Sequence, residues 1–315
     1  DPKEDGTAGR RGVYLITDAA GVVERVRTIL AADIDPAHHR DLLTCAELTG
    51  ACSGVAPGPE PNWISYTVAF AEPLTVRGEL AFEVVHSPEN SLRSHEGLLG
   101  MVGRAGEGDT VLVEQFYERV HWGAADDTPA TAPNLRLEAY LAAARRGARV
   151  RILLDGFFEA GQNAETVSYL QGVARREGLD LEVRLANPTF LGLPNKMVLA
   201  EIDGRGFVHV GSLNGSEVSS KANREVALQV RSDDAYGYLK AVFEHDWYTT
   251  RLNTYLPVVA RAYQGPQPAH HLLIAELYYR DVPERQWVEL YNPTSWPIHL
   301  GGSRIGDAAN QGDYE

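Results

Sequence analysis

The chain has 315 residues, of which 44% are hydrophobic, enough for one sizeable core or two modest ones. Its formal net charge of -14 argues against bulk attraction of a nucleic acid, so any phosphate binding has to come from a local group of side chains. No run of about eighteen apolar residues occurs, and no membrane-spanning segment is expected.

The two cysteines, Cys45 and Cys52, lie seven residues apart in a stretch rich in glycine and proline, residues 48–61. This arrangement is typical of a small disulfide loop in an exported protein, and the alternative is a pair of reduced cysteines in a cytosolic loop. Neither cysteine stands beside paired histidines, so we expect no zinc site and no cofactor. On this basis we expect an extracellular or cell-surface location.

The first 81 residues are predicted to form a β-rich region to which no chemistry can be assigned. Short apolar or alternating runs separated by glycine and proline indicate strands there. The candidate strands are Val13–Ile16, Val22–Arg27, Trp63–Val68 and Leu74–Val85.

From Phe82 onward the pattern changes to strands that alternate with helices. Strands are predicted at 82–85, 110–116, 149–155, 179–185, 197–203, 207–210 and 225–230, and helices at 87–102, 134–146, 163–176 and 233–247. Such alternation favours an α/β fold with a mixed, largely parallel sheet and helices on both faces.

Functional groups in such sheets gather at the carboxyl ends of strands. Here that placement singles out Glu114-Gln115, Asp155-Gly156 and the stretch that follows Leu193. His86 at another strand end, and His121-Trp122 beside the expected cleft, are weaker candidates.

The stretch after Leu193 contains four groups in a characteristic order. They are Pro194-Asn195-Lys196, a carboxylate at Glu201 or Asp203, Gly211-Ser212-Leu213-Asn214, and Asn223-Arg224-Glu225. The order resembles the phospholipase D superfamily, whose mark is His-x-Lys, four residues, Asp, and then a hairpin into Gly-Ser-x-Asn. The resemblance covers about residues 82–250, one of the two half-units that normally complete a site.

The resemblance implies a phosphodiesterase in which histidine attacks phosphorus, lysine and asparagine stabilise the phosphate oxygens, and the aspartate orients the histidine. Pro194 occupies the position of the nucleophile, and proline has neither a nucleophile nor a proton to give. Glu201 is five residues after Lys196 and Asp203 is seven residues after it, so either carboxylate, or neither, takes the place of the aspartate.

The remaining candidates each have a structural alternative. Lys196 and Asn214 are predicted anion ligands, or Lys196 forms an ion pair with Glu201 or Glu225. Glu225 is a candidate for orienting a site group. Ser212 donates to a phosphate or caps the helix predicted at 216–221, and His209 either replaces the missing histidine or packs within its strand.

Residues 251–268 have the prolines of a linker, and strands are predicted at 272–279 and 286–293. The run Gln286–Asn292 resembles the start of a lamin-tail domain, an immunoglobulin-like β-sandwich, and residues 269–315 are too few for a complete one. The expected organisation is thus 1–81, 82–250, 251–268 and 269–315.

Three functions remain open. The first is an exported phospholipase D-like half with a degenerate site that binds a phosphodiester or supports an assembly. The second is an active phosphodiesterase whose histidine comes from a second half, from another chain in a homodimer or from His209. The third is a cell-surface scaffold protein.

Overall fold

The computed structural model describes residues 11–35, 37, 70, 72–189 and 191–254, and two strands at 273–278 and 287–291. Cys45, Cys52 and the predicted strand Trp63–Val68 lie outside these residues. The chain divides into two compact units, Asp1–Tyr255 and Leu256–Glu315. The division falls inside the predicted linker, and each unit is described by itself.

The first helix, α1 (Ala20–Ile34), stands where a strand was predicted at Val22–Arg27, and that prediction is wrong. Val22 and Ile29 are both buried, and a spacing of seven residues places them on one helical face. The preceding residues 13–16 form no strand, although Val13 and Leu15 pack against the sheet. The described part of residues 1–81 therefore contains a helix rather than the expected strands.

A seven-stranded sheet forms the centre of the first unit, in the order β1-β7-β6-β5-β2-β3-β4. Its strands are β1 (Phe82–Ser87), β2 (Thr110–Gln115), β3 (Arg149–Asp155), β4 (Leu181–Ala186), β5 (Lys196–Ile202), β6 (Arg205–Gly211) and β7 (Glu225–Arg231). All seven correspond to predicted strands, with ends shifted by at most two residues except at β1, whose predicted run began at Leu74.

The sheet is mixed, as predicted, but it is not largely parallel. Only β2 with β3 and β3 with β4 are parallel, whereas the other four neighbouring pairs are antiparallel. The sequence β5-β6-β7 explains the difference, because tight connections such as the one between β5 and β6 can join only antiparallel strands. Consequently the starts of β5 and β7 lie at the same edge as the ends of β1, β2, β3, β4 and β6.

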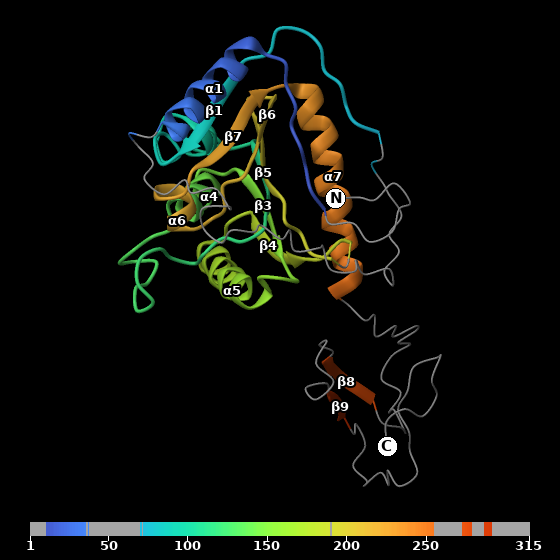
Figure 1. Cartoon of the computed structure of the whole chain (residues 1–315). Helices are drawn as coiled ribbons and strands as arrows, with labels where there is room; N and C mark the ends of the chain where they lie inside the picture. Colours follow the sequence, from blue (N-terminus) through green and yellow to red (C-terminus); the bar gives the residue numbers. More distant parts are fainter. Residues whose placement is uncertain are drawn as a thin grey trace, which may run out of the picture. The chain divides into compact units, whose positions relative to one another are not determined.

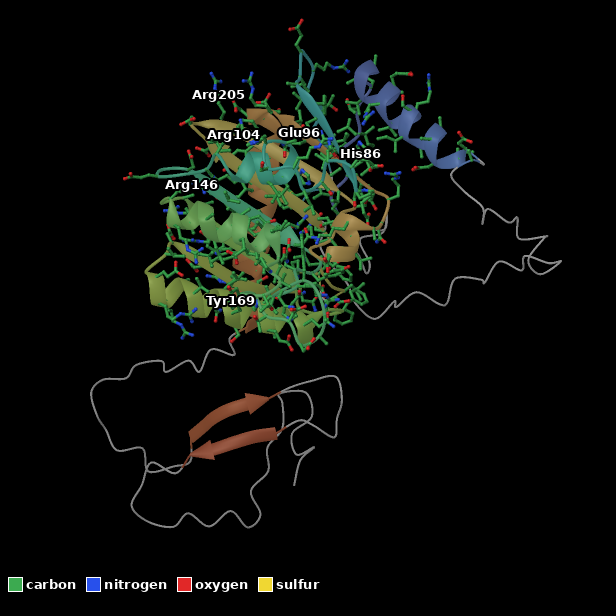
Figure 2. The ribbon with its side chains drawn as sticks, turned by 90° about the vertical axis from the view of Figure 1, so that its left-hand side faces the viewer. His86, Glu96, Arg104, Arg146, Tyr169 and Arg205 are labelled. Carbon is green, nitrogen blue, oxygen red and sulfur yellow. The ribbon has the colours of Figure 1, made fainter. Side chains whose placement is uncertain are left out.

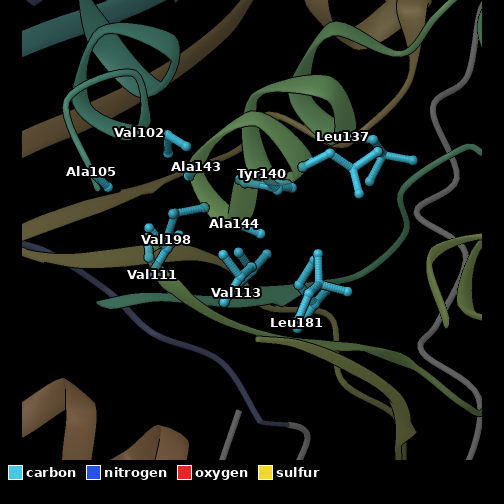
Figure 3. Packing of buried hydrophobic residues seen from close by; sticks show 14 of the residues in the cluster. Val102, Ala105, Val111, Val113, Leu137, Tyr140, Ala143, Ala144, Leu181 and Val198 are labelled. Carbon is cyan, nitrogen blue, oxygen red and sulfur yellow. The ribbon is translucent and has the colours of Figure 1, made fainter. Parts of the chain in front are cut away.

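Helices cover both faces of the sheet, as predicted (Figure 1). On one face, α3 (Gly97–Val102), α4 (Leu135–Arg145) and α5 (Ala160–Glu177) cover the larger core. Val113, Leu137 and Tyr140 are among its residues (Figure 3). On the other face, α7 (Asp233–Thr254) contributes Phe243 and Trp247 to a second core that includes Met197 and Val208. Neighbouring residues of each strand alternate between these two cores.

The long helix predicted at 87–102 is wrong in its first half. Strand β1 continues to Ser87, the Ser87-Pro88 peptide bond is cis, and turns occupy the residues up to α3 at Gly97. The side-chain oxygen of Asn90 accepts from the backbone nitrogen of His86 at 2.7 Å, and its amide donates to Val84 at 3.1 Å. These bonds let a turn compete with a helix, because asparagine side chains replace backbone partners.

Capping residues fix the other helix ends. Asn134 caps α4 by accepting from the backbone nitrogens of Arg136 and Leu137, and Gly178 ends α5 in the left-handed conformation with φ of 69°. Ser216, not Ser212, caps the short helix α6 (Glu217–Lys221) through a bond from the nitrogen of Ser219.

The described part of the second unit is an antiparallel pair of strands, β8 (Leu273–Tyr278) and β9 (Trp287–Tyr291), with a register shift between Ile274 and Glu276. The two predicted strands are confirmed, and the immunoglobulin-like sandwich stays a prediction. Across the described residues of both units, no helix combines the length and apolar character that a bilayer crossing needs.

Candidate functional site

One edge of the sheet gathers the polar residues that the sequence singled out. Gln115 at the end of β2 pairs with Lys196 at the start of β5, and Ser87 at the end of β1 pairs with Glu225 at the start of β7. The ends of β3 and β6, at Asp155 and Gly211, lie along the same edge. The antiparallel course of β5 and β7 therefore brings their first residues to the carboxyl ends of the other strands.

Lys196 is half-buried at this edge. Its Nζ donates to the carbonyl oxygen of Pro194 at 3.1 Å and lies 5.4 Å from the centroid of the Phe116 ring. Burial lowers the pKa of Lys196, and the negative charge of Glu225 opposes that shift. Among the described residues the hydrogen-bond partner of this partly desolvated cation is one neutral oxygen, so the ammonium group retains capacity to bind an anion.

Asn214 and Glu225 are joined through Ser219. The backbone nitrogen of Asn214 donates to Ser219 Oγ at 2.8 Å, and that hydroxyl donates to Glu225 Oε1 at 3.1 Å. Asn223 also donates to Glu225 Oε1, at 3.2 Å. The side-chain Oδ1 of Asn214 is buried and has no hydrogen-bond partner among the residues that the structure describes. Ser219 thus links Asn214 to Glu225, and the charge of Glu225 acts on Lys196 at the same sheet edge. The role of these three residues as an anion site stays a prediction.

Ser212 stands apart from this group. Its hydroxyl accepts from the backbone nitrogen of Val226 at 3.1 Å and is itself exposed. It lines a groove of about 390 Å³ whose walls include Val13, Val26 and Val210, residues on the α1 side of the sheet. The role of Ser212 as a phosphate donor is therefore not favoured by its position.

Glu201 and Asp203 lie at the opposite edge of the sheet. Glu201 pairs with Thr110 at the start of β2, and five residues of strand separate it from Lys196 by about 17 Å. Its carboxylate lies 3.9 Å from Nζ of Lys240. Asp203 forms the hairpin after β5 with a φ of 52°, and its nitrogen donates to Asp109 at 2.9 Å. Neither carboxylate can contact Lys196. In Figure 2, Arg205 and His86 mark these two edges.

His209 is buried within β6 between Val198 and Gln229. The pKa of its imidazole is lowered to about 3, mainly by burial and also by the charge of Arg136, against the opposing effect of a hydrogen bond with Gln229. The ring faces away from Val208 and Val210, as expected, and is therefore a neutral core histidine. Its position does not support it as a replacement for the missing nucleophile.

The weaker candidates have structural partners. His86 is buried, with its ring 2.9 Å from both Arg25 Nη2 and Glu89 Oε2. Glu114 is fully buried and accepts from Asn195 at 2.7 Å. His121 Nδ1 contacts the carbonyl oxygen of Trp122 at 2.8 Å. Each of these side chains is therefore engaged in contacts within the protein, which favours a structural role over contact with a ligand.

A buried network beneath the Asn214 loop was missed by the sequence reading. Arg136 donates through Nε to Glu118 at 2.7 Å and through Nη2 to Gln115 at 3.1 Å. Gln115 in turn donates to the carbonyl oxygen of Leu213 at 3.1 Å, and Asn134 donates to that of Gly215 at 3.1 Å. The network braces residues 213–215 from below and so fixes the position of Asn214.

Residues 128–247 match the family described as "Cardiolipin synthase, PLD-like domain", and no curated protein matches the sequence. This segment, which contains Lys196, Asn214 and Glu225, is similar to a PLD-like domain, the kind of domain that the order of these residues predicted.

Several solved structures are similar. Nuc from Salmonella typhimurium, a phospholipase D family member, is 19% identical over 54% of this chain and 96% of its own, with a TM-score of 0.40. NucT from Helicobacter pylori is 19% identical over 54% of this chain and 98% of its own, with the same TM-score of 0.40. Phosphatidylserine synthase from Haemophilus influenzae Rd KW20 is 14% identical over 56% of this chain and 40% of its own, with a TM-score of 0.35.

Proposed function

We propose that the first unit is a phospholipase D-like half that binds a phosphoryl group and does not cleave it. The observation that carries this proposal is the group formed by Lys196, Asn214 and Glu225 at one sheet edge, next to a proline in the nucleophile's position. Lys196 supplies the positive charge, and the amide of Asn214 supplies a donor to a phosphate oxygen.

The absence of catalysis follows from the residues near Lys196. Covalent phosphoryl transfer needs a nucleophile that can reach phosphorus, and Pro194 offers none. His209 is enclosed in the core with a pKa of about 3, and His86 is held between Arg25 and Glu89. In the described part of the chain, no other histidine forms a hydrogen bond or an ion pair with Lys196, Asn214 or Glu225.

Export, and a second phospholipase D-like half or copy of this chain as a partner, remain parts of the proposal. Export rests on Cys45 and Cys52, and a partner rests on the resemblance to half of a two-half site. Measuring free thiols with and without a reductant would test the disulfide, since two free thiols in the purified, unreduced protein would contradict it.

A titration with inorganic phosphate or tungstate tests the binding itself. A ligand that binds only the folded state raises the melting temperature with concentration. We expect a saturable rise for the native chain that disappears in Lys196→Ala. The matched control is Lys240→Ala, because Lys240 also lies over an aromatic ring, 5.7 Å from that of Tyr236, but on helix α7 near Glu201 at the far edge.

Three results would count against the proposal. They are no shift of the native chain at millimolar ligand, a shift that survives Lys196→Ala, and a shift that Lys240→Ala abolishes equally. The last result would mean that the anion raises the melting temperature through the net charge of the protein and not through a specific site.

A further inference from the structure

A turn that displays two phenylalanines adjoins Lys196. The turn follows β3, where the buried carboxylate of Asp155 accepts from the backbone nitrogens of Phe157 at 3.1 Å, Phe158 at 2.6 Å and Glu159 at 3.0 Å. The other oxygen of Asp155 accepts from the nitrogen of Leu193 at 2.6 Å. One carboxylate thus anchors both the aromatic turn and the chain that leads into Lys196.

The rings form a continuous series that reaches the lysine. The Phe157 and Phe158 centroids are 4.8 Å apart at an interplanar angle of 88°, and those of Phe158 and Phe116 are 6.1 Å apart at 64°. The ammonium group of Lys196 lies 5.4 Å from the centroid of the Phe116 ring. Tyr117 continues the series beyond Phe116, with centroids 5.6 Å apart.

The two outer rings are unusually exposed for their type. Phe157 is 39% and Phe158 is 45% exposed, although their backbone is held by a fully buried carboxylate. A fixed turn that keeps two aromatic rings partly exposed beside a half-buried cation is suited to contact a ligand.

We infer that the Phe157-Phe158 turn selects a phosphoester that carries a flat aromatic or heteroaromatic ring, such as an aryl phosphate or a mononucleotide. This inference rests on the proposed function, because Lys196 is assigned to hold the phosphoryl group. The ring of the ligand stacks on or packs edge-to-face against the exposed phenylalanines, an arrangement that any base or aryl group can make.

Two features favour a ring over an acyl chain. Two adjacent side chains present an area that matches one or two flat rings, whereas an acyl chain needs a longer lined channel. The apolar groove of about 390 Å³ lies elsewhere, between Val13, Val26 and the Val210 side of the sheet.

The net charge of -14 also disfavours a long polyanion, which limits the ligand to a short phosphoester.

Three ligands test this inference at a pH at which each is a dianion: inorganic phosphate, phenyl phosphate and butyl phosphate. Dissociation constants come from competition against tungstate in the melting assay or from chemical-shift titration. For the native chain we expect phenyl phosphate to bind about fivefold or more tightly than butyl phosphate, the scale of one stacking contact.

The variants separate the ring contact from general apolar contact. Phe157→Ala and Phe158→Ala should remove the preference for phenyl phosphate over butyl phosphate and weaken the binding of phenyl phosphate more than that of inorganic phosphate. Phe158→Leu keeps apolar volume without a ring and should also reduce the preference. Tyr248→Ala, on α7 and 60% exposed, is the control that should change neither value.

The outcomes distinguish this inference from the proposed function. Failure of the native chain to bind inorganic phosphate overturns both. Binding of phosphate with equal affinity for phenyl and butyl phosphate, or tighter binding of butyl phosphate, overturns the aromatic assignment alone and points to a lipid-like ligand. A preference that persists in Phe157→Ala and Phe158→Ala also overturns it.

Discussion

The side-chain amide of Asn195 donates to the carboxylate of Glu114 at 2.7 Å, on the face of the sheet opposite Lys196. Adjacent strand residues point to opposite faces, so Asn195 turns toward α7 while Pro194 and Lys196 face the other way. This bond ties the start of β5 to the end of β2 and helps to fix the backbone from which Lys196 projects.

The same bond leads to a pH-dependent prediction. The pKa of Glu114 is raised from 4.5 to about 8, mainly by burial and also by the charge of Asp246, while Asn195 and Arg11 oppose the shift. Because the pKa of Glu114 is higher in the folded than in the unfolded chain, the protonated carboxyl adds to the free energy of unfolding. This contribution is complete below about pH 4.5 and is lost as the pH rises to about 8. Glu114→Gln cannot lose a proton, so its free energy of unfolding should improve relative to the native chain over this range.

Urea denaturation at about pH 5 and about pH 9 measures this effect. The exposed Glu165→Gln is the matched control and should show the same difference from the native chain at both pH values. An equal difference for Glu114→Gln at both pH values would contradict a neutral, buried Glu114 carboxyl.

Gly215→Ala should damage the loop that carries Asn214. A Cβ at this position would lie 1.9 Å from Oε2 of Glu118, a group already bonded to Arg136. Overpacking of this kind costs about 1–3 kcal/mol, and we expect reduced phosphate affinity as well. The control is Gly237→Ala in helix α7, where a Cβ has nothing within 4 Å and alanine should stabilise by about 0.5–1 kcal/mol. Chemical denaturation checks both, and equal stability of the two variants would refute the close approach.

The N-terminal segment is held by a buried ion pair. Arg11 Nε donates to Asp246 at 2.6 Å, and Asp246 is fully buried on α7. Arg11→Ala leaves this carboxylate without its main counter-charge and should cost about 3–5 kcal/mol. Arg27→Ala removes an exposed pair with Glu24 and should change stability by less than about 1 kcal/mol. Similar losses in the two variants would contradict the importance of the Arg11 contact.

Pro194→His tests whether only the nucleophile is missing. Positions 194 and 196 face the same side, so an imidazole there should reach phosphorus held by Lys196. With bis-p-nitrophenyl phosphate the ring nitrogen bonds to phosphorus and p-nitrophenolate leaves with the bonding electron pair. We expect release of this product and a phosphohistidine detectable by mass spectrometry.

Two controls accompany that variant. Pro194→Gln offers no comparable nucleophile and should release nothing. The double variant Pro194→His, Lys196→Met should also be inactive, because the charge that holds the phosphate is gone. No product from Pro194→His itself would argue that the site has lost more than its histidine.

Much of the fold could be predicted because its signals are local. The apolar run of β3 at Arg149–Asp155 and the glycine after α5 lie as predicted. Helix α1 was missed because Val22-Val23 and Val26 fit both a strand pattern and a helical stripe over so few residues. The antiparallel pairing of β2 with β5 joins segments far apart in sequence, and no local pattern reports it.

The site was predictable only in part, because local motifs do not report contacts between segments that are far apart in sequence. Lys196, Asn214 and Glu225 follow a recognisable order, and the starts of β5 and β7 place Lys196 and Glu225 at the same sheet edge. Glu201 and Asp203 match the motif in spacing, but strand length carries them to the far edge. Arg136 and Glu118 are separated by eighteen residues and by a loop, so their pairing has no sequence signature.

The central claim is that this unit binds a phosphodiester without cleaving it. A single phosphorus NMR experiment follows both events when bis-p-nitrophenyl phosphate is mixed with the native chain. We predict saturable broadening or shifting of the diester signal, lost in Lys196→Ala, with no phosphomonoester signal over the incubation. A growing monoester signal that Lys196→Ala abolishes would contradict the claim and show a working phosphodiesterase.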